Sequence, residues 1–212
     1  MYTEIAAVAC LLAIAGEGVT MFVFGPRYPG YSQLKDTMSA LGASASPVSA
    51  QMSAWWIIMG LLMVVFGTGI RTEFRGKGRP AAFASWLVIL YGLGEGIGSG
   101  AFKADRLVNG LATSAIIHDA VGAVGVVAVL IFPLVMKRLI ARDEKPFFRP
   151  MSRIIFVTGL LTVGFFLFRY LPDKDSILVA YKGLWQRLFM LNTYVYMGTV
   201  AVLMLVRRRL RS

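Results

Sequence analysis

The residues best suited to chemistry are two glutamates that stand inside long apolar stretches of the sequence. Glu17 and Glu95 each occupy the centre of a Gly-Glu-Gly triplet. A charged side chain is costly in the hydrocarbon of a bilayer, so such residues face a bundle interior, a wet cavity or a partner. Two neighbouring carboxyl groups in such a place can hold a proton and deliver it to an apolar substrate, which is general acid–base chemistry. We therefore predict Glu17 and Glu95 as candidate catalytic residues.

A histidine and several polar residues are the next candidates. His118 is the only histidine of the chain and opens an apolar stretch; it completes the predicted catalytic set. Residues that we expect to bind substrate lie near the ends of apolar stretches or in the first segment that connects two of them. They are Asp36, Ser39, Asp119, Arg169, Trp185, Gln186 and Arg187.

Two other chemistries have weaker support. Zinc hydrolases of the seven-span ceramidase-like kind bind metal through several histidines, whereas this chain offers one histidine and carboxylates. Ser114 and His118 are four residues apart and would share a helix face, but no Gly-x-Ser-x-Gly elbow occurs. We therefore predict no metal and no cofactor. A further alternative stays open, in which Arg169 or Arg187 neutralises the acids as a structural ion pair.

Composition and hydropathy indicate the elements that position these residues. Of the 212 residues, 57% are hydrophobic and 16% are charged, and the mean hydropathy is +0.68. A membrane-spanning helix needs about 20 mostly apolar residues. Six stretches qualify, near residues 5–24, 52–70, 81–102, 115–136, 154–171 and 188–206. The sequence predicts an all-α fold, a six-helix transmembrane bundle that forms one integral membrane domain over residues 1–212.

The basic residues indicate the orientation of this bundle. Four of the 22 basic residues follow the second stretch, six follow the fourth and four follow the sixth, so 14 lie on one side of a six-span topology. The positive-inside rule makes that side cytoplasmic and places both termini there. We expect a multi-pass protein of the cell membrane whose basic residues contact anionic lipid headgroups and not nucleic acid.

The polar candidates gather at one predicted depth. Glu17 lies seven residues before Phe24 and Glu95 seven before Phe102, which places each roughly 10 Å below the outer boundary of the hydrocarbon. Residues 31–41 place apolar side chains at helical spacing, which predicts a short amphipathic helix at the outer mouth with Asp36 directed inward. We expect Glu17, Glu95, His118 and Arg187 to line one outward-open cavity.

Glycines fill every second position from Gly92 to Gly100 around Glu95. Read as a helix, Gly92, Gly96 and Gly100 form one stripe of small residues, and Gly94 and Gly98 form another. Such stripes let the backbones of membrane helices approach closely. Helix packing explains these glycines but does not explain the acid among them.

Four segments together resemble the prokaryotic multi-pass membrane proteins catalogued as domain of unknown function nine-nine-eight. They are residues 28–42, the glycine run 92–100, the pair at 118–119 and Leu-Trp-Gln-Arg at 184–187. The resemblance covers nearly the whole chain and implies a six-span prokaryotic membrane protein. It implies no activity.

Two classes of function remain open from the residues. The first is acid–base chemistry on a lipid or isoprenoid-like substrate, an apolar or amphipathic small molecule that enters from the outer leaflet. The second is a non-enzymatic lipid-binding, proton-coupled transport or accessory protein. A carrier needs access from both sides of the membrane, and the inner halves of the predicted spans are almost purely apolar.

Overall fold

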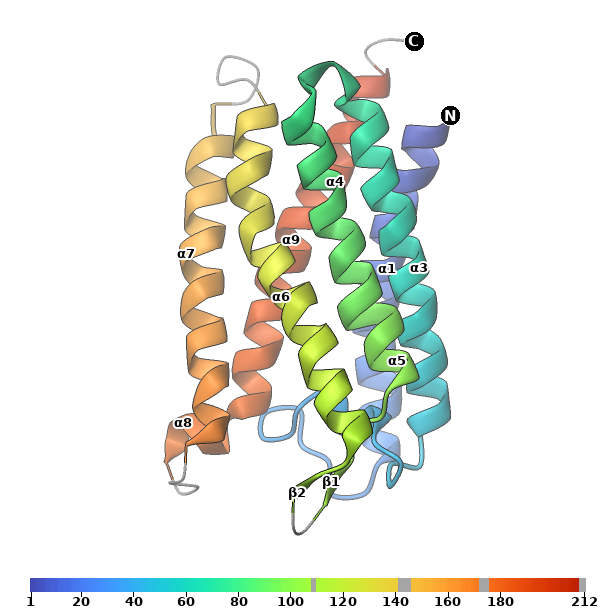
Figure 1. Cartoon of the computed structure of the whole chain (residues 1–212), viewed down its shortest axis with the longest axis vertical. Helices are drawn as coiled ribbons and strands as arrows, with labels where there is room; N and C mark the ends of the chain where they lie inside the picture. Colours follow the sequence, from blue (N-terminus) through green and yellow to red (C-terminus); the bar gives the residue numbers. More distant parts are fainter. Residues whose placement is uncertain (108–109, 141–145, 172–175, 210–212) are drawn as a thin grey trace.

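A computed structural model of the chain describes residues 1–107, 110–140, 146–171 and 176–209, and Figure 1 shows it as an upright bundle. The long helices are α1 (Tyr2–Phe24), α3 (Ser49–Glu73), α4 (Arg79–Tyr91), α6 (Thr113–Leu139), α7 (Phe148–Leu167) and α9 (Lys182–Arg209). The helix of α4 continues through a π-helical segment, η3 (Gly92–Gly98), into α5 (Ser99–Ala101). Short 3-10 segments, η1 (Gly25–Arg27) and η4 (Phe168–Tyr170), extend α1 and α7, and η2 (Arg75–Lys77) precedes α4.

In the part of the chain that the structure describes, six helices are long and apolar enough to cross a membrane. They cover Tyr2–Arg27, Ser49–Glu73, Arg79–Ala101, Thr113–Leu139, Phe148–Tyr170 and Lys182–Arg208. The predicted six-helix bundle is therefore confirmed, with each predicted stretch inside one of these helices or within a residue of its end.

The six helices form a closed ring whose order in space is their order in the chain. Each packs against the next, α1 on α3, α3 on α4, α4 on α6, α6 on α7 and α7 on α9, and α9 closes the ring against α1. Because six helices alternate in direction, both termini lie at the same end of the bundle (Figure 1).

Large side chains fill the interior of the ring. Phe66, Tyr91, Phe132 and Tyr196 are at most 1% exposed. The hydroxyl of Tyr91 on α4 donates to that of Tyr194 on α9 across 3.1 Å. Apolar side chains also cover the outside of the bundle, as expected of helices that face lipid.

The two predicted glycine stripes face two different helices. A Cβ atom added at Gly96 would lie 2.3 Å from the Cα of Gly60 on α3, and one at Gly94 would lie 2.3 Å from the carbonyl oxygen of Val121 on α6. Only residues without a side chain permit backbones this close. The segment around Glu95 is therefore held tightly between α3 and α6.

The connection between α1 and α3 differs from the prediction. A helix over residues 31–41 was expected, and the helix found there, α2, covers only Ser39–Gly42. The Asp36 carboxylate accepts a hydrogen bond from the Ser32 amide at 2.8 Å, while the Asp36 amide donates to the Ser32 carbonyl at 2.8 Å. Aspartate side chains that bond to nearby backbone in this way compete with helix formation.

Two short elements complete the end of the bundle that lies opposite the termini. A hairpin of β1 (Arg106–Leu107) and β2 (Gly110–Leu111), paired antiparallel, connects α5 to α6. The helix α8 (Ile177–Ala180) precedes α9. The sequence analysis did not predict the hairpin.

Candidate functional site

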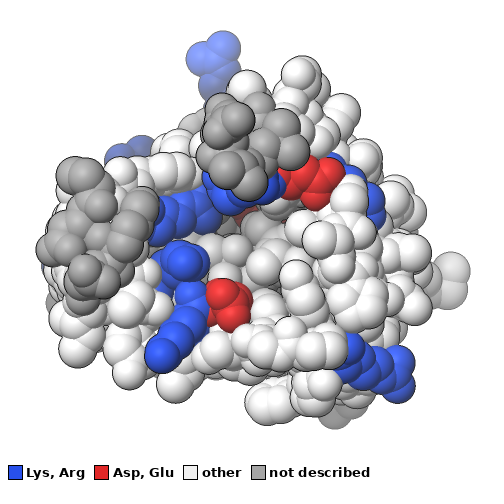
Figure 2. Space-filling model, turned by 90° about the horizontal axis from the view of Figure 1, so that it is seen from below, with Lys and Arg blue, Asp and Glu red and all other residues white. Residues whose placement is uncertain are grey.

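Seven of the ten predicted site residues line two spaces at the end of the bundle opposite the termini. The larger, which we call the basin, has a volume of about 820 Å³ and opens at this end. Figure 2 views this end, where acidic and basic side chains surround a hollow. The charged residues that line the basin are Asp36, Asp105, Arg106, Arg169 and Lys182.

The smaller space, which we call the chamber, lies among the helices. Glu17, Glu95 and His118 all line it. Its other lining residues are Met38, Ser39, Trp56, Met59, Ser99, Gln186 and Met190. Its volume of about 20 Å³ is close to the roughly 10–15 Å³ that one water molecule requires. The structure thus brings the three predicted catalytic residues together, around a space for about one water.

Glu17 is held by two tryptophans of α3. The side chain is 2% exposed. Its Oε2 accepts a hydrogen bond from the indole nitrogen of Trp55 at 2.6 Å, and its Oε1 accepts one from that of Trp56 at 3.4 Å. Gly16 makes room for the first indole, because a Cβ atom there would lie 2.0 Å from the Trp55 ring. The hydrogen bonds of this carboxylate therefore come from neutral donors, and no arginine among the described residues donates to it.

Glu95 lies in the middle of the π-helical segment η3. Segments of π-helix are rare and frequently occur at functional sites. Gly122 and Gly125 of α6 form a cradle for the side chain, because Cβ atoms there would lie 2.8 Å from Glu95 Oε1 and 3.0 Å from Glu95 Cγ. Within the described part of the chain, the carboxylate has no hydrogen bond and no ion pair. Among the described residues, neither Arg169 nor Arg187 forms a direct ion pair with this acid.

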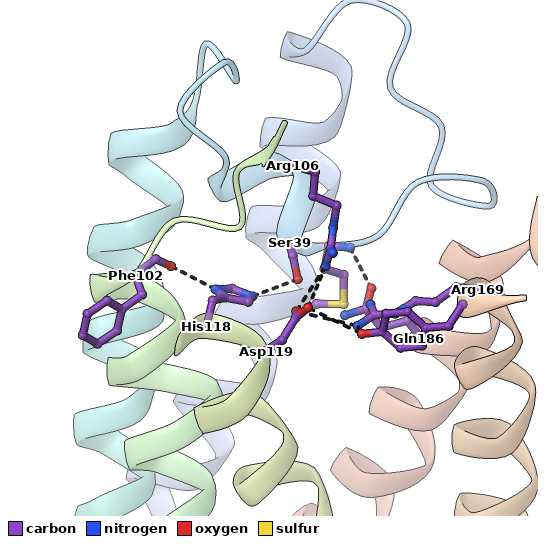
Figure 3. Close-up of polar contacts among 9 residues, drawn as sticks. Ser39, Phe102, Arg106, His118, Asp119, Arg169 and Gln186 are labelled. Carbon is purple, nitrogen blue, oxygen red and sulfur yellow. Dashed lines mark hydrogen bonds and ion pairs between the residues drawn. The ribbon is translucent and has the colours of Figure 1, made fainter. Parts of the chain in front are cut away.

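His118 lines the chamber and contacts Ser39, which lies between the chamber and the basin. Its Nδ1 lies 2.9 Å from the carbonyl oxygen of Phe102, and its Nε2 lies 3.2 Å from the hydroxyl oxygen of Ser39 (Figure 3). Ser39 lines both the chamber and the basin. The sequence analysis named Ser39 and His118 separately and did not predict their contact, which joins residues 79 positions apart.

Asp119 joins two arginines beside this pair (Figure 3). An Arg106 nitrogen lies 3.1 Å from both carboxylate oxygens of Asp119, and an Arg169 nitrogen lies 3.7 Å from one of them. The Arg169 guanidinium also stacks on the Phe166 ring, 4.1 Å from its centroid, and its Nε is buried with no hydrogen-bond partner among the described residues. Sequence reasoning missed Arg106, which lies in the hairpin that it did not predict.

Arg187 lies outside both spaces, contrary to the prediction that it lines a cavity. It donates to Gln33 Oε1 at 2.8 Å, to the Asp36 carbonyl at 2.9 Å and to the Gly183 carbonyl at 3.0 Å, and it contacts the Tyr31 hydroxyl. Burial raises the pKa of Tyr31, although Arg187 acts in the opposite direction. Arg187 therefore fastens the first connecting segment to the start of α9.

Trp185 and Gln186 are neighbours in the sequence, but only Gln186 lines one of the two spaces. The Trp185 indole donates to the Leu178 carbonyl at 3.0 Å, and its ring packs on Phe165, so it lines neither space. Gln186 lines the chamber, and its Oε1 accepts a hydrogen bond from the Met38 amide at 2.8 Å. The predicted single cavity is thus two spaces, with residues 38 and 39 between them.

One further acid shapes the rim of the basin. Asp105 accepts hydrogen bonds from the Ser44 amide and hydroxyl, both at 2.7 Å. These bonds hold the pKa of Asp105 below its usual range. Among the described residues, no group of three histidine, cysteine or acidic side chains is arranged to hold a metal ion.

Comparison with known families gives one match. A family model described as protein of unknown function (DUF998) matches residues 5–203. No curated protein and no solved structure matches the chain.

Proposed function

We propose a function from the geometry of the site itself, because the chain belongs to a family, DUF998, whose description names no activity. We place the protein in the cell membrane with both termini in the cytoplasm. The asymmetry of the basic residues supports this orientation. The basin then opens toward the outside, at the level of the outer leaflet.

The function that we propose is acid–base chemistry on a lipid or isoprenoid-like amphiphile. The polar head of the substrate occupies the basin, and Glu95 exchanges a proton with it, directly or through a water in the chamber. Glu17 and His118 complete the set of groups that handle protons. One observation carries the proposal: in its glycine cradle, the Glu95 carboxylate has no hydrogen-bond or ion-pair partner among the residues that the structure describes. The Glu95 side chain is partly exposed and lines the chamber, so its carboxylate can bond to a water or to a group of the substrate there.

A second candidate function has one specific observation in its favour. The chamber has room for about one water and not for a substrate group. A non-enzymatic protein that binds a lipid in the basin, or that couples proton uptake at Glu95 to another process, would need no more space than this.

The substitution Glu95→Gln tests the proposal, because it removes the acid and keeps the shape. Purified protein in lipid nanodiscs is incubated with a membrane lipid extract, and mass spectrometry follows the loss of substrate and the appearance of product. We expect turnover by the wild type and none by Glu95→Gln. The two proteins should melt within a few degrees of each other, because the carboxylate forms no hydrogen bond with any described residue that the substitution could break.

Glu4→Gln is the matched control. Glu4 is an exposed acid in the first turn of α1, far from both spaces, and it pairs with the terminal amine. This variant should turn over lipid like the wild type. Full turnover by Glu95→Gln would refute the proposal. A lipid that copurifies with the wild type and is never converted would favour the non-enzymatic function.

A further inference from the structure

We propose that Ser39 is a nucleophile, with His118 as its base, for acyl transfer from a carboxylic ester of an amphiphile bound in the basin. This inference rests on the basin as the substrate site, as proposed above, but it does not depend on the role of Glu95. The contact between Ser39 and His118 carries it.

The two hydrogen bonds of His118 determine where its proton lies. A carbonyl oxygen can only accept, so Nδ1 must carry the hydrogen that it donates to Phe102 at 2.9 Å. In the neutral imidazole, Nε2 is then an acceptor, and the hydrogen of the 3.2 Å contact comes from the Ser39 hydroxyl. The serine proton therefore already points at the base, and a third group orients that base. This is the arrangement that activates a serine in nucleophilic catalysis.

The position of Ser39 gives a substrate access to it. Ser39 is partly exposed and lines the basin, where a volume of about 820 Å³ is open to a ligand. The preceding residue, Met38, is buried, and its amide is fixed by the 2.8 Å bond to Gln186. A serine and a histidine that served packing alone would have no need of this opening.

The surroundings of Ser39 suit an ester with a charged head. Arg106, Arg169 and Lys182 line the same basin and can attract a phosphate or carboxylate group. The buried Nε of Arg169 has no hydrogen-bond partner among the described residues. The positive charges of the residues that line the basin can also attract the negative charge that develops on a carbonyl oxygen under attack.

The reaction proceeds in two balanced halves. Ser39 Oγ forms a bond to the ester carbonyl carbon and its proton passes to His118 Nε2. The bond from that carbon to the alkoxy oxygen breaks, and His118 protonates the departing oxygen, so an alcohol leaves and the acyl group remains on Ser39. A water then attacks the acyl carbon, His118 takes its proton and returns one to Ser39, and a carboxylic acid leaves. The chamber, lined by both residues, has room for such a water.

A long-chain alkyl fluorophosphonate tests the proposal on the intact protein in nanodiscs. The serine oxygen bonds to phosphorus and fluoride leaves, which gives an adduct of defined mass. We expect peptide mapping to place the adduct on Ser39 and Ser39→Ala to lack it. His118→Gln should label about 10²–10⁴-fold more slowly, which is the usual contribution of a general base.

Ser114→Ala is the matched control. Ser114 lies four residues before His118 on the same helix and is the serine that spacing alone would pair with it. It should label at the wild-type rate. Thermal melting of each variant identifies any that fails to fold. Ser39→Ala loses one hydrogen bond to His118 and should melt within a few degrees of the wild type.

The proposal is overturned if the folded wild type forms no adduct at Ser39, or if His118→Gln labels as fast as the wild type. Glu95→Gln separates this proposal from the previous one. An adduct at Ser39 together with full lipid turnover by Glu95→Gln would support Ser39 as the nucleophile and refute the acid–base role of Glu95. Loss of turnover in Glu95→Gln without any labelled serine would support the acid–base role of Glu95 and refute Ser39 as the nucleophile.

Discussion

Alanine in place of Gly16 should destabilise the protein by displacing Trp55 from Glu17. A Cβ atom at residue 16 would lie 2.0, 2.5 and 2.9 Å from three atoms of the Trp55 ring, whereas ordinary contact begins at 3.4 Å. The indole must therefore retreat by about 1.4 Å, the difference between 3.4 and 2.0 Å. Such a shift breaks its 2.6 Å bond to Glu17 and leaves the acid with the longer bond, 3.4 Å, from Trp56.

Gly18 provides the matched comparison. It lies on the other side of Glu17 in the same helix, and a Cβ atom there meets nothing within 4 Å. Both substitutions gain about 0.5–1 kcal/mol from the better helix propensity of alanine, so this gain cancels between them. Loss of a hydrogen bond to a charged group costs about 1.5–3 kcal/mol. Gly16→Ala should therefore be less stable than Gly18→Ala by about this amount.

Thermal unfolding in detergent measures the difference. For a chain of this size, 1 kcal/mol shifts Tm by about 2–4 °C, so Gly16→Ala should melt about 3–12 °C below Gly18→Ala. The penalty should largely disappear in a Trp55→Phe background, where the shorter ring has no bond to lose. Equal Tm values for the two alanine variants, or an unchanged penalty in Trp55→Phe, would refute the reasoning.

Two further predictions concern the first connecting segment and the orientation. Arg187→Lys keeps the charge but loses the forked hydrogen bonds to Gln33 and two carbonyls. Hydrogen exchange of the backbone amides of residues 25–48 should therefore accelerate, by more than about tenfold if one such bond is lost. Unchanged exchange would contradict the role of Arg187 in holding this segment against α9. In intact cells, with the buried Cys10 replaced by alanine, a cysteine at the exposed Lys35 should react with an impermeant thiol reagent and one at the exposed Gly76 should not. The reverse pattern would invert the orientation.

The bundle was predictable, as was the grouping of Glu17, Glu95 and His118 around one space, because hydropathy and the cost of buried charge act on single segments. A stretch of about 20 apolar residues has few alternatives to a membrane helix. The glycine stripes were predictable for a similar reason, since spacing alone places Gly92 and Gly96 on one face and Gly94 on another. None of these features requires knowledge of which helix lies next to which.

The partners within the site were not predictable, because they depend on how each helix is rotated against its neighbours. The acids suggested an arginine as partner, but Glu17 receives its hydrogen bonds from Trp55 and Trp56. Spacing suggested Ser114 for the histidine, but packing brings Ser39 to it. The π-helical segment around Glu95 packs closely against both α3 and α6, and a single segment of sequence does not reveal either neighbour.

The ring order of the helices has a consequence for the biogenesis of the site. Five of the six contacts in the ring join successive helices, so each hairpin can form as soon as its second helix is synthesised and inserted. The sixth, between α9 and α1, must wait until α9 emerges. The chamber needs Gln186 from α9 as well as Glu17 from α1. A nascent chain that stops before α9 can therefore embed five helices in the bilayer while the chamber still lacks the residues that α9 contributes.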